Sequence, residues 1–157
     1  MPRRPYKKRP IEKDEIYGSL EVLKLINYIM LHGKKRVSEK IVYGVLEKIK
    51  NENKDPIKTL NQAISNVAPD HEVKPRRLGG ASYLVPIQVR NNRKIYLALN
   101  WIVEKASAKS NKEFKTFGEK LYREIVDAAN NQGDAVGKKL ETERLAEANK
   151  AFSHLKW

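Results

Sequence analysis

The side chains best suited to catalysis are few in this sequence and are not grouped. The chain has no cysteine, and its three histidines, His32, His71 and His154, lie far apart without the spacing of metal ligands. Neither a G-x-x-x-x-G-K-[ST] loop nor a G-x-G-x-x-G loop occurs. Acidic residues mostly stand beside lysines, as Glu47 and Glu104 do, which is typical of solvated helix faces. We therefore expect no enzymatic activity, no metal site and no cofactor.

Basic residues are more informative, because they are abundant and clustered. Lysine and arginine total 32 against 19 acidic residues, which gives a formal net charge of +13 and a pI near 9.8. This charge favours a polyanionic partner, since each neutralised phosphate releases counterions; a merely soluble basic protein is the alternative. The residues expected to contact nucleic acid are Arg3, Arg4, Lys7, Lys8, Arg9, Lys34, Lys35, Arg36, Lys74, Arg76, Arg77, Arg90, Arg93, Lys94, Lys138, Lys139, Arg144, Lys150, Lys156 and Trp157.

Residues 1–13 are expected to form a basic N-terminal extension. Three prolines in this stretch oppose regular structure, and no apolar segment of a secretory signal follows Met1. Tyr6 and the interleaved prolines favour a tail that becomes ordered on nucleic acid, although a solvated tail would have the same composition. No apolar run approaches the ~20 residues that span a bilayer, so the protein should act where it is made, in the cytoplasm, or in the organelle matrix if it is organelle-encoded.

The second cluster, Lys34-Lys35-Arg36, lies where a helix is expected to begin. Cations at a helix N-terminus oppose the macrodipole by roughly 0.3–1 kcal/mol each. A bound phosphate would compensate, because both the side chains and the helix end attract it. A solvated charge run is the alternative. At the other end of the chain, Trp157 suits either stacking at an interface or closure of the core.

Helical spacing of apolar residues accounts for most of the remaining chain. Gly33 is expected to end the first helix in the left-handed conformation, and Asp55-Pro56 to start the third as cap and first residue. Val37, Ile41, Val45 and Ile49 recur every four residues and predict one buried face. The last helix has a looser stripe, so it should leave surface for a partner. Helices are predicted over about 20–30, 37–49, 56–67, 95–106, 114–128 and from 134 onwards.

Residues 72–90 carry the only strand signal. Apolar residues recur at every second position from Tyr83 to Val89, and Gly79-Gly80 predicts a two-residue hairpin turn. Two prolines, Pro75 and Pro86, cannot donate ladder bonds, so neither strand should lie inside a larger sheet. Because a lone two-stranded ribbon is marginal in water, it should project from the helical body and lean on a partner.

Two features of this hairpin concern its side chains. We expect Tyr83 to pack underneath the ribbon. Arg76 and Arg77 must lie on opposite faces, and the sequence leaves open which of them shares the face of Tyr83. Both should act on a partner, although ion pairs with Asp70 or Glu72 would also explain them.

Taken together, the chain is expected to be mainly α, with about six helices and one protruding antiparallel hairpin. Residues 14–157 would form a single domain behind the extension. No exposed heptad seam is apparent, so no homo-oligomer is expected.

Four segments resemble small-subunit ribosomal protein seven of the bacterial or organellar type. They cover essentially the whole chain in order. The hairpin stretch 76–86 is similar to that of the family, and so are Lys24-Leu25-Ile26-Asn27 through Gly33-Lys34-Lys35 in the first two helices. The others are Asp127-Ala128-Ala129-Asn130-Asn131 and Ala146-Glu147-Ala148-Asn149-Lys150-Ala151-Phe152.

The resemblance implies a structural role in the small ribosomal subunit. It implies primary binding to the 3′ major domain of the small-subunit ribosomal RNA, which nucleates head assembly. It also implies a position near the exit-site tRNA and the mRNA path, beside small-subunit ribosomal protein eleven and other head proteins. Some bacterial members repress translation of their own operon mRNA, so the same capacity is implied here.

The sequence departs from the family pattern at three places. Pro75 replaces a small residue and removes a backbone donor, and Asn100 stands where an arginine is usual, so one phosphate contact is in doubt. Leu155-Lys156-Trp157 replaces a Tyr-Arg-Trp ending. A rival function is that of a DNA-architectural protein whose β-ribbon arm enters a groove. Preference for structured RNA over duplex DNA would separate the two.

Overall fold

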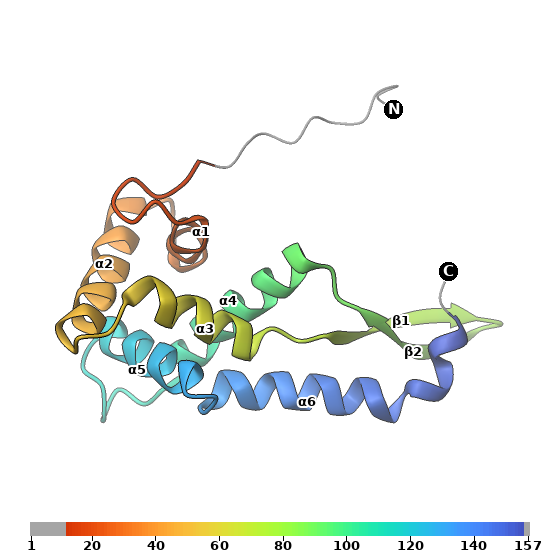
Figure 1. Ribbon diagram of the computed structural model, residues 1–157. Helices are drawn as coiled ribbons and strands as arrows, with labels where there is room; N and C mark the ends of the chain where they lie inside the picture. Colours follow the sequence, from red (N-terminus) through yellow and green to blue (C-terminus); the bar gives the residue numbers. More distant parts are fainter. Residues whose placement is uncertain (1–11, 156–157) are drawn as a thin grey trace, which may run out of the picture.

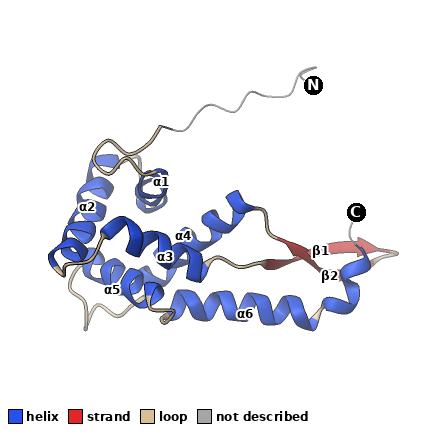
Figure 2. Cartoon of the chain, viewed as in Figure 1, coloured by secondary structure: helices blue, strands red, loops and turns tan. Residues whose placement is uncertain are grey.

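The computed structural model describes residues 12–155 of the chain. Six α-helices, one two-stranded antiparallel hairpin and a short 3-10 helix make up this part (Figures 1 and 2), so the predicted mainly α fold is confirmed. None of the described helices is long and apolar enough to cross a membrane. In chain order the elements are α1 (Leu20–Ile29), α2 (Lys35–Asn51), α3 (Pro56–Val67), β1 (His71–Leu78), β2 (Ala81–Gln88), α4 (Asn91–Ala108), α5 (Phe117–Ala129), α6 (Asp134–Ala148) and η1 (Lys150–Leu155).

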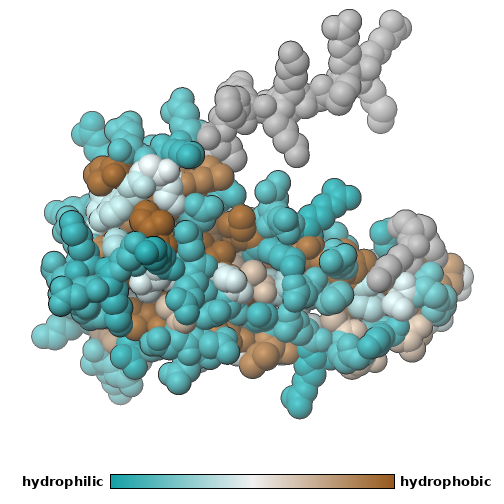
Figure 3. Space-filling model, in the orientation of Figure 1, coloured by the Kyte–Doolittle hydropathy of each residue, from teal (hydrophilic) through white to brown (hydrophobic). Residues whose placement is uncertain are grey.

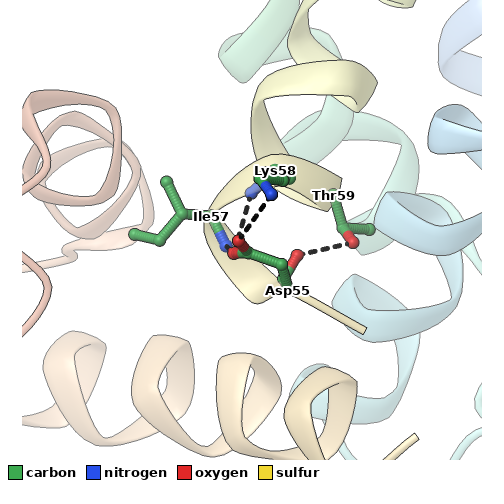
Figure 4. Close-up of polar contacts among 4 residues, drawn as sticks. All are labelled: Asp55, Ile57, Lys58 and Thr59. Carbon is green, nitrogen blue, oxygen red and sulfur yellow. Dashed lines mark hydrogen bonds and ion pairs between the residues drawn. The ribbon is translucent and has the colours of Figure 1, made fainter. Parts of the chain in front are cut away.

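The start of α3 confirms the predicted cap. Asp55 Oδ1 accepts hydrogen bonds from the backbone N–H groups of Ile57 (3.0 Å) and Lys58 (3.2 Å), and Thr59 Oγ1 donates to the Asp55 carbonyl (2.8 Å), as Figure 4 shows. Pro56 occupies the first helical position, where a missing N–H costs nothing. The cap therefore satisfies two donors that the helix itself leaves unpaired.

Replacing Asp55 with alanine is expected to lower the free energy of unfolding by about 1 kcal/mol, because two backbone donors lose their acceptor. Asp55→Asn keeps a side-chain oxygen at the same place and should lower the free energy of unfolding by only a few tenths of a kcal/mol. Urea unfolding of both variants measures the difference. Equal losses for alanine and asparagine would show that the charge of Asp55, and not its cap, contributes the stability.

The end of α1 differs from the prediction. The helix stops at Ile29 with Met30 as its C-cap in an extended conformation, so it is not Gly33 that ends it. Gly33 does adopt a left-handed φ of +71°, but it does so in the turn that leads into α2, where His32 is also left-handed (φ +52°). The glycine thus shapes the connection between the two helices and does not end the first one.

The core lies between the first five helices and the start of α6. Val45 and Ile49 belong to it as predicted, but Val37 is 55 % exposed and Ile41 is half-buried. The reason is geometric: an α-helix turns by about 100° per residue, so every-fourth-residue spacing drifts by about 40° at each step. Over the twelve residues from Val37 to Ile49 the drift reaches about 120°, which moves Val37 off the buried face.

The hairpin turn is the predicted one. Gly79 (φ +56°) and Gly80 (φ +90°) both have the positive φ that a two-residue turn of this kind requires. The register places Arg76 opposite Tyr83 and Arg77 opposite Ser82. Because directly paired residues share a face, Arg76 lies on the face of Tyr83, and Arg77 lies on the other.

The hairpin does not stand alone, contrary to the expectation that it would lean only on a partner. In Figure 1 it points away from the helices α1–α5, while α6 runs along it and η1 packs against β2. The rings of Tyr83 and Phe152 lie 5.2 Å apart, and Val85 is fully buried. Tyr83 therefore packs as predicted, and the support missing from a two-stranded ribbon comes from α6 and η1.

The looser stripe of α6 is confirmed. Leu140 is 61 % exposed and Leu145 is also exposed, whereas Ala135, Val136 and Ala146 are buried. The helix contacts α3, α4 and α5 as well as both strands of the hairpin, and Lys139, beyond its first turn, still reaches Asn66 of α3. Its apolar residues are thus divided between two neighbours.

A buried carboxylate fixes where α6 begins. Glu124 of α5 is fully buried, and its Oε1 accepts a hydrogen bond from Ala135 N–H (2.8 Å) in the first turn of α6. Its Oε2 lies 2.7 Å from Lys109 Nζ at the end of α4, at an angle that makes the contact an ion pair and not a hydrogen bond. A Cβ at Gly133 (φ +91°) would lie 3.2 Å from Oε1. Three helices therefore meet at one side chain.

Candidate nucleic-acid interface

The two ends of the predicted interface cannot be placed. Arg3, Arg4, Lys7, Lys8 and Arg9, together with Lys156 and Trp157, lie outside the described residues. The other thirteen predicted contact residues are described. Figure 3 shows hydrophilic side chains over most of the visible face, with hydrophobic ones among them where α1 and α2 lie.

The start of α2 presents cations without the usual compensation. Lys34 is the N-cap residue and supplies no side-chain cap, and no acidic residue stands in the first turn. Lys34, Lys35 and Arg36 are all exposed. Lys35 makes a loose ion pair with Glu39 (3.5 Å), while the side chains of Lys34 and Arg36 make no hydrogen bond or ion pair with the residues described. This helix end therefore has the charge and the free backbone N–H groups that favour an anion.

The start of α4 has the same character. Arg90 is an exposed N-cap residue without a side-chain cap, and again no acid occupies the first turn. Arg93 and Lys94 differ from the prediction, because both have partners within the chain. Arg93 pairs with Glu72 (3.3 Å) and lies 5.1 Å above the ring of Tyr96. These contacts fasten α4 to β1, which leaves Arg90 as the more available cation.

Lys94 forms a second ion pair of this kind, with Asp70 just before β1. The hydrogen bond from the ammonium, followed by its charge, lowers the pKa of Asp70 below its ordinary value. Asp70 and Glu72 had been considered as partners for the hairpin arginines, but in the structure their main partners come from α4. Arg77 is exposed and makes no hydrogen bond or ion pair within residues 12–155, whereas Arg76 is half-buried on the Tyr83 face. Lys74 lies 3.7 Å from Glu72.

Most cations of α6 and η1 are also paired locally. Lys138 pairs with Glu141 and Lys150 with Glu147, each at 2.8 Å, and these hydrogen bonds raise the pKa of both lysines. Lys139 Nζ donates to the Asn66 carbonyl (3.0 Å). Such exposed pairs are weak and can exchange partners. In this group only Arg144 has no hydrogen bond or ion pair to the rest of the described chain.

Two aromatic residues that the sequence reasoning missed connect the basic helix ends. Tyr28 of α1 packs edge-on against Tyr96 of α4, with ring centroids 5.4 Å apart. Burial, followed by the neighbouring Tyr96, raises the pKa of Tyr28. Tyr28 and Lys34 also line the same cavity. The signal was an aromatic residue close to each basic run, as in Arg93-Lys94-Ile95-Tyr96.

A buried acid at the other end of α1 fixes the start of the body. Asp14 accepts hydrogen bonds from the hydroxyl of Tyr43 (2.8 Å) and from the backbone N–H groups of Ile16 (3.2 Å) and Tyr17 (2.9 Å). Burial, strengthened by this hydrogen bond, raises the pKa of Tyr43, which stays protonated as a donor. The point at which the predicted basic extension joins the helices is thus held against α2.

The chain is similar to known proteins over its whole length. A family model described as ribosomal protein S7p/S5e matches residues 1–150. Curated relatives named small ribosomal subunit protein uS7 match over the full length of both chains. The relative from Caldicellulosiruptor bescii is 50% identical over 159 residues, that from Thermotoga maritima 49% over 158, and that from Dictyoglomus thermophilum 50% over 159.

Proposed function

The chain belongs to the ribosomal protein S7p/S5e family, and we therefore propose that it binds small-subunit ribosomal RNA directly, mainly through phosphates. Membership makes it a structural constituent of the small ribosomal subunit and not an enzyme.

One observation carries the proposal: the N-terminal ends of α2 and α4 both present exposed cations, and neither has an acidic residue in its first turn. Tyr28 and Tyr96 join these ends into one surface. Backbone N–H groups, helix dipoles and side-chain charges there all favour the same ligand, a phosphate. Arg77, exposed on the hairpin face opposite Tyr83, would add a further phosphate contact.

The family resemblance supports a more specific role. We propose that the chain is a primary binder of the 3′ major domain of the small-subunit RNA and nucleates assembly of the head. The exit-site tRNA, the mRNA path and small-subunit ribosomal protein eleven would be its neighbours, in a cytoplasmic ribosome. Repression of its own operon mRNA would use the same phosphate-binding surface. The basic extension 1–13 would add contacts to a domain formed by residues 14–157.

The affinity for an RNA fragment of the 3′ major domain is expected to fall steeply with salt. If about eight phosphates are engaged, the logarithm of the association constant should fall against the logarithm of the salt concentration with a slope of roughly −6 to −7. Filter binding or fluorescence anisotropy over several salt concentrations measures this slope.

Competition with duplex DNA of equal length supplies the control. A chain built for ribosomal RNA should release the RNA only at a large excess of the duplex. A slope near zero would contradict phosphate-dominated binding, and equal competition by the duplex would favour the DNA-architectural alternative.

A further inference from the structure

A cavity of about 350 Å³ opens beside the basic start of α2. It lies where the end of α1, the first turns of α2, the second half of α4 and the start of α5 meet. Its size falls within the range of small-molecule sites, and its wall is largely apolar. The apolar side chains of the wall include Tyr28, Leu31, Val37, Ile41, Val103 and Phe117.

One buried polar residue of this wall has no partner. Ser38 is only 3 % exposed, and it lines the cavity, yet its hydroxyl makes no hydrogen bond to the rest of the described chain. Other serines of the neighbourhood are satisfied: Ser19 caps α1, and Ser107 Oγ donates to the Val103 carbonyl (2.8 Å). The hydroxyl faces the cavity and can be hydrated in the free protein, but a molecule that fills the cavity would cut it off from water. Because a buried hydroxyl without a partner is costly, such a molecule must bring a polar group to Ser38.

The residues at the mouth indicate the charge of that molecule. Lys34 lines the cavity and is the exposed N-cap residue of α2, a helix end with no acidic residue in its first turn. Leu31 and Val37 are 71 % and 55 % exposed, so the apolar wall continues out to the surface near this cation. The ligand must therefore join an apolar body to negative charge.

We propose that this cavity receives one unstacked nucleobase of the bound RNA. The proposal rests on the RNA-binding function proposed above. The base lies among the apolar and aromatic side chains, its polar edge bonds to the Ser38 hydroxyl, and an adjacent phosphate meets Lys34 and the N-terminal end of α2. Proteins commonly recognise unpaired RNA bases in this way, by packing against their faces and hydrogen bonding to their edges.

The unpaired hydroxyl also separates a base from the main competing occupant. An apolar side chain of an acidic protein segment would fill the cavity and satisfy Lys34, but it would leave Ser38 without a hydrogen bond. A base brings donors and acceptors on its edge together with a phosphate on each side. A base with its phosphates thus matches the apolar wall, the Ser38 hydroxyl and the positive charge at the mouth of the cavity.

Blocking the cavity tests the proposal. Ser107 is exposed at its rim on α4, so Ser107→Trp places a large side chain over the opening and leaves the core untouched. The matched control is Ser65→Trp, at an exposed serine of α3 that does not line the cavity. Each protein is bound to the RNA fragment of the 3′ major domain, and its bases are probed with dimethyl sulfate and carbodiimide.

With the unaltered chain and with Ser65→Trp, one or two unpaired nucleotides should be protected that Ser107→Trp leaves reactive, while the remaining protections stay the same. The affinity for the fragment should fall about tenfold in Ser107→Trp alone. An identical footprint and affinity in all three proteins would overturn the proposal and favour a protein side chain as the occupant. Failure of the unaltered chain to bind would instead overturn the proposed RNA binding itself.

A second variant keeps the test independent of the bulky substitution. Ser38→Ala removes only the unpaired hydroxyl, so the melting temperature of the free protein should stay the same or rise. Its RNA affinity should fall about fivefold with an unchanged salt slope, because no phosphate contact is lost. Lys34→Ala should instead make the slope shallower by about one. An unchanged affinity in Ser38→Ala would remove the hydroxyl from the site and contradict the proposal.

Discussion

Replacing Glu124 with alanine is expected to lower the free energy of unfolding by roughly 3–5 kcal/mol, the loss typical of breaking a buried ion pair from one side. The substitution leaves Lys109 near the surface without its partner and Ala135 N–H without its acceptor. Because the Lys109 side chain is 14 % exposed and can turn towards water, the lower end of this range is the better expectation. Chemical denaturation measures the loss.

Two further variants divide this effect into its parts. Glu124→Gln keeps an oxygen for Ala135 N–H but removes the charge, so it should lose less than alanine. Lys109→Met leaves the fully buried carboxylate of Glu124 without its cation and so lowers the free energy of unfolding. Adding Glu124→Gln to Lys109→Met should recover part of that lost stability, as expected of residues in direct contact. The control is Glu113→Ala, an exposed acid in the loop before α5, with a change within about 0.5 kcal/mol. Equal effects at Glu113 and Glu124 would contradict a special role for the buried acid.

Replacing Arg76 and Arg77 together with alanine is expected to cost roughly 2–4 kcal/mol of RNA affinity, taking about 1.5–3 kcal/mol for each charged hydrogen bond and allowing for overlap. The register separates their contributions. Arg77 is exposed on the face opposite Tyr83, so Arg77→Ala should change the stability of the free protein by less than about 0.5 kcal/mol. Arg76 is half-buried on the Tyr83 face, so its replacement can change both the RNA affinity and the stability of the free protein.

The matched control removes the same charge from another exposed place. Lys112→Ala with Lys115→Ala, in the loop between α4 and α5, lowers the net charge equally but lies outside the proposed surface. Its effect on affinity should be the small one of long-range attraction, and it should weaken further as salt is added. If the hairpin variant loses stability while keeping its affinity, the arginines are structural and the ribbon is not a main RNA contact.

The parts of the fold that depend on neighbouring residues could be predicted from the sequence. Asp55-Pro56 and Gly79-Gly80 act through their own backbone conformations, so the start of α3 and the hairpin turn followed from them. The predicted burial of Val37 was wrong because a spacing of four residues only approximates the helical period. Glu124 had a visible signal: it lies within the stripe of Leu121, Ile125 and Ala128, where an acid must be buried and paired.

The site was harder to predict, because its properties depend on which elements meet. The pairing of Arg93 and Lys94 with acids before and within β1 requires α4 to fold back beside the hairpin, which no local pattern shows. Composition marked these cations as equivalent to Arg90, whereas the structure gives only Arg90 an unpaired side chain among these three. The cavity beside Ser38 forms only where four helices meet, so no local sequence pattern predicts it.

The support of the hairpin by α6 and η1 sets an order of events during synthesis. The ribbon is complete once Gln88 has been made, but the segment that packs against it extends to Leu155, about 70 residues later. At roughly 5–20 residues per second this delay lasts roughly 3–14 s. During that interval the nascent chain carries an unsupported ribbon with two open edges, which is marginally stable and prone to pair with other chains. Pro75 and Pro86, one on each strand, limit such pairing because neither can donate a backbone hydrogen bond.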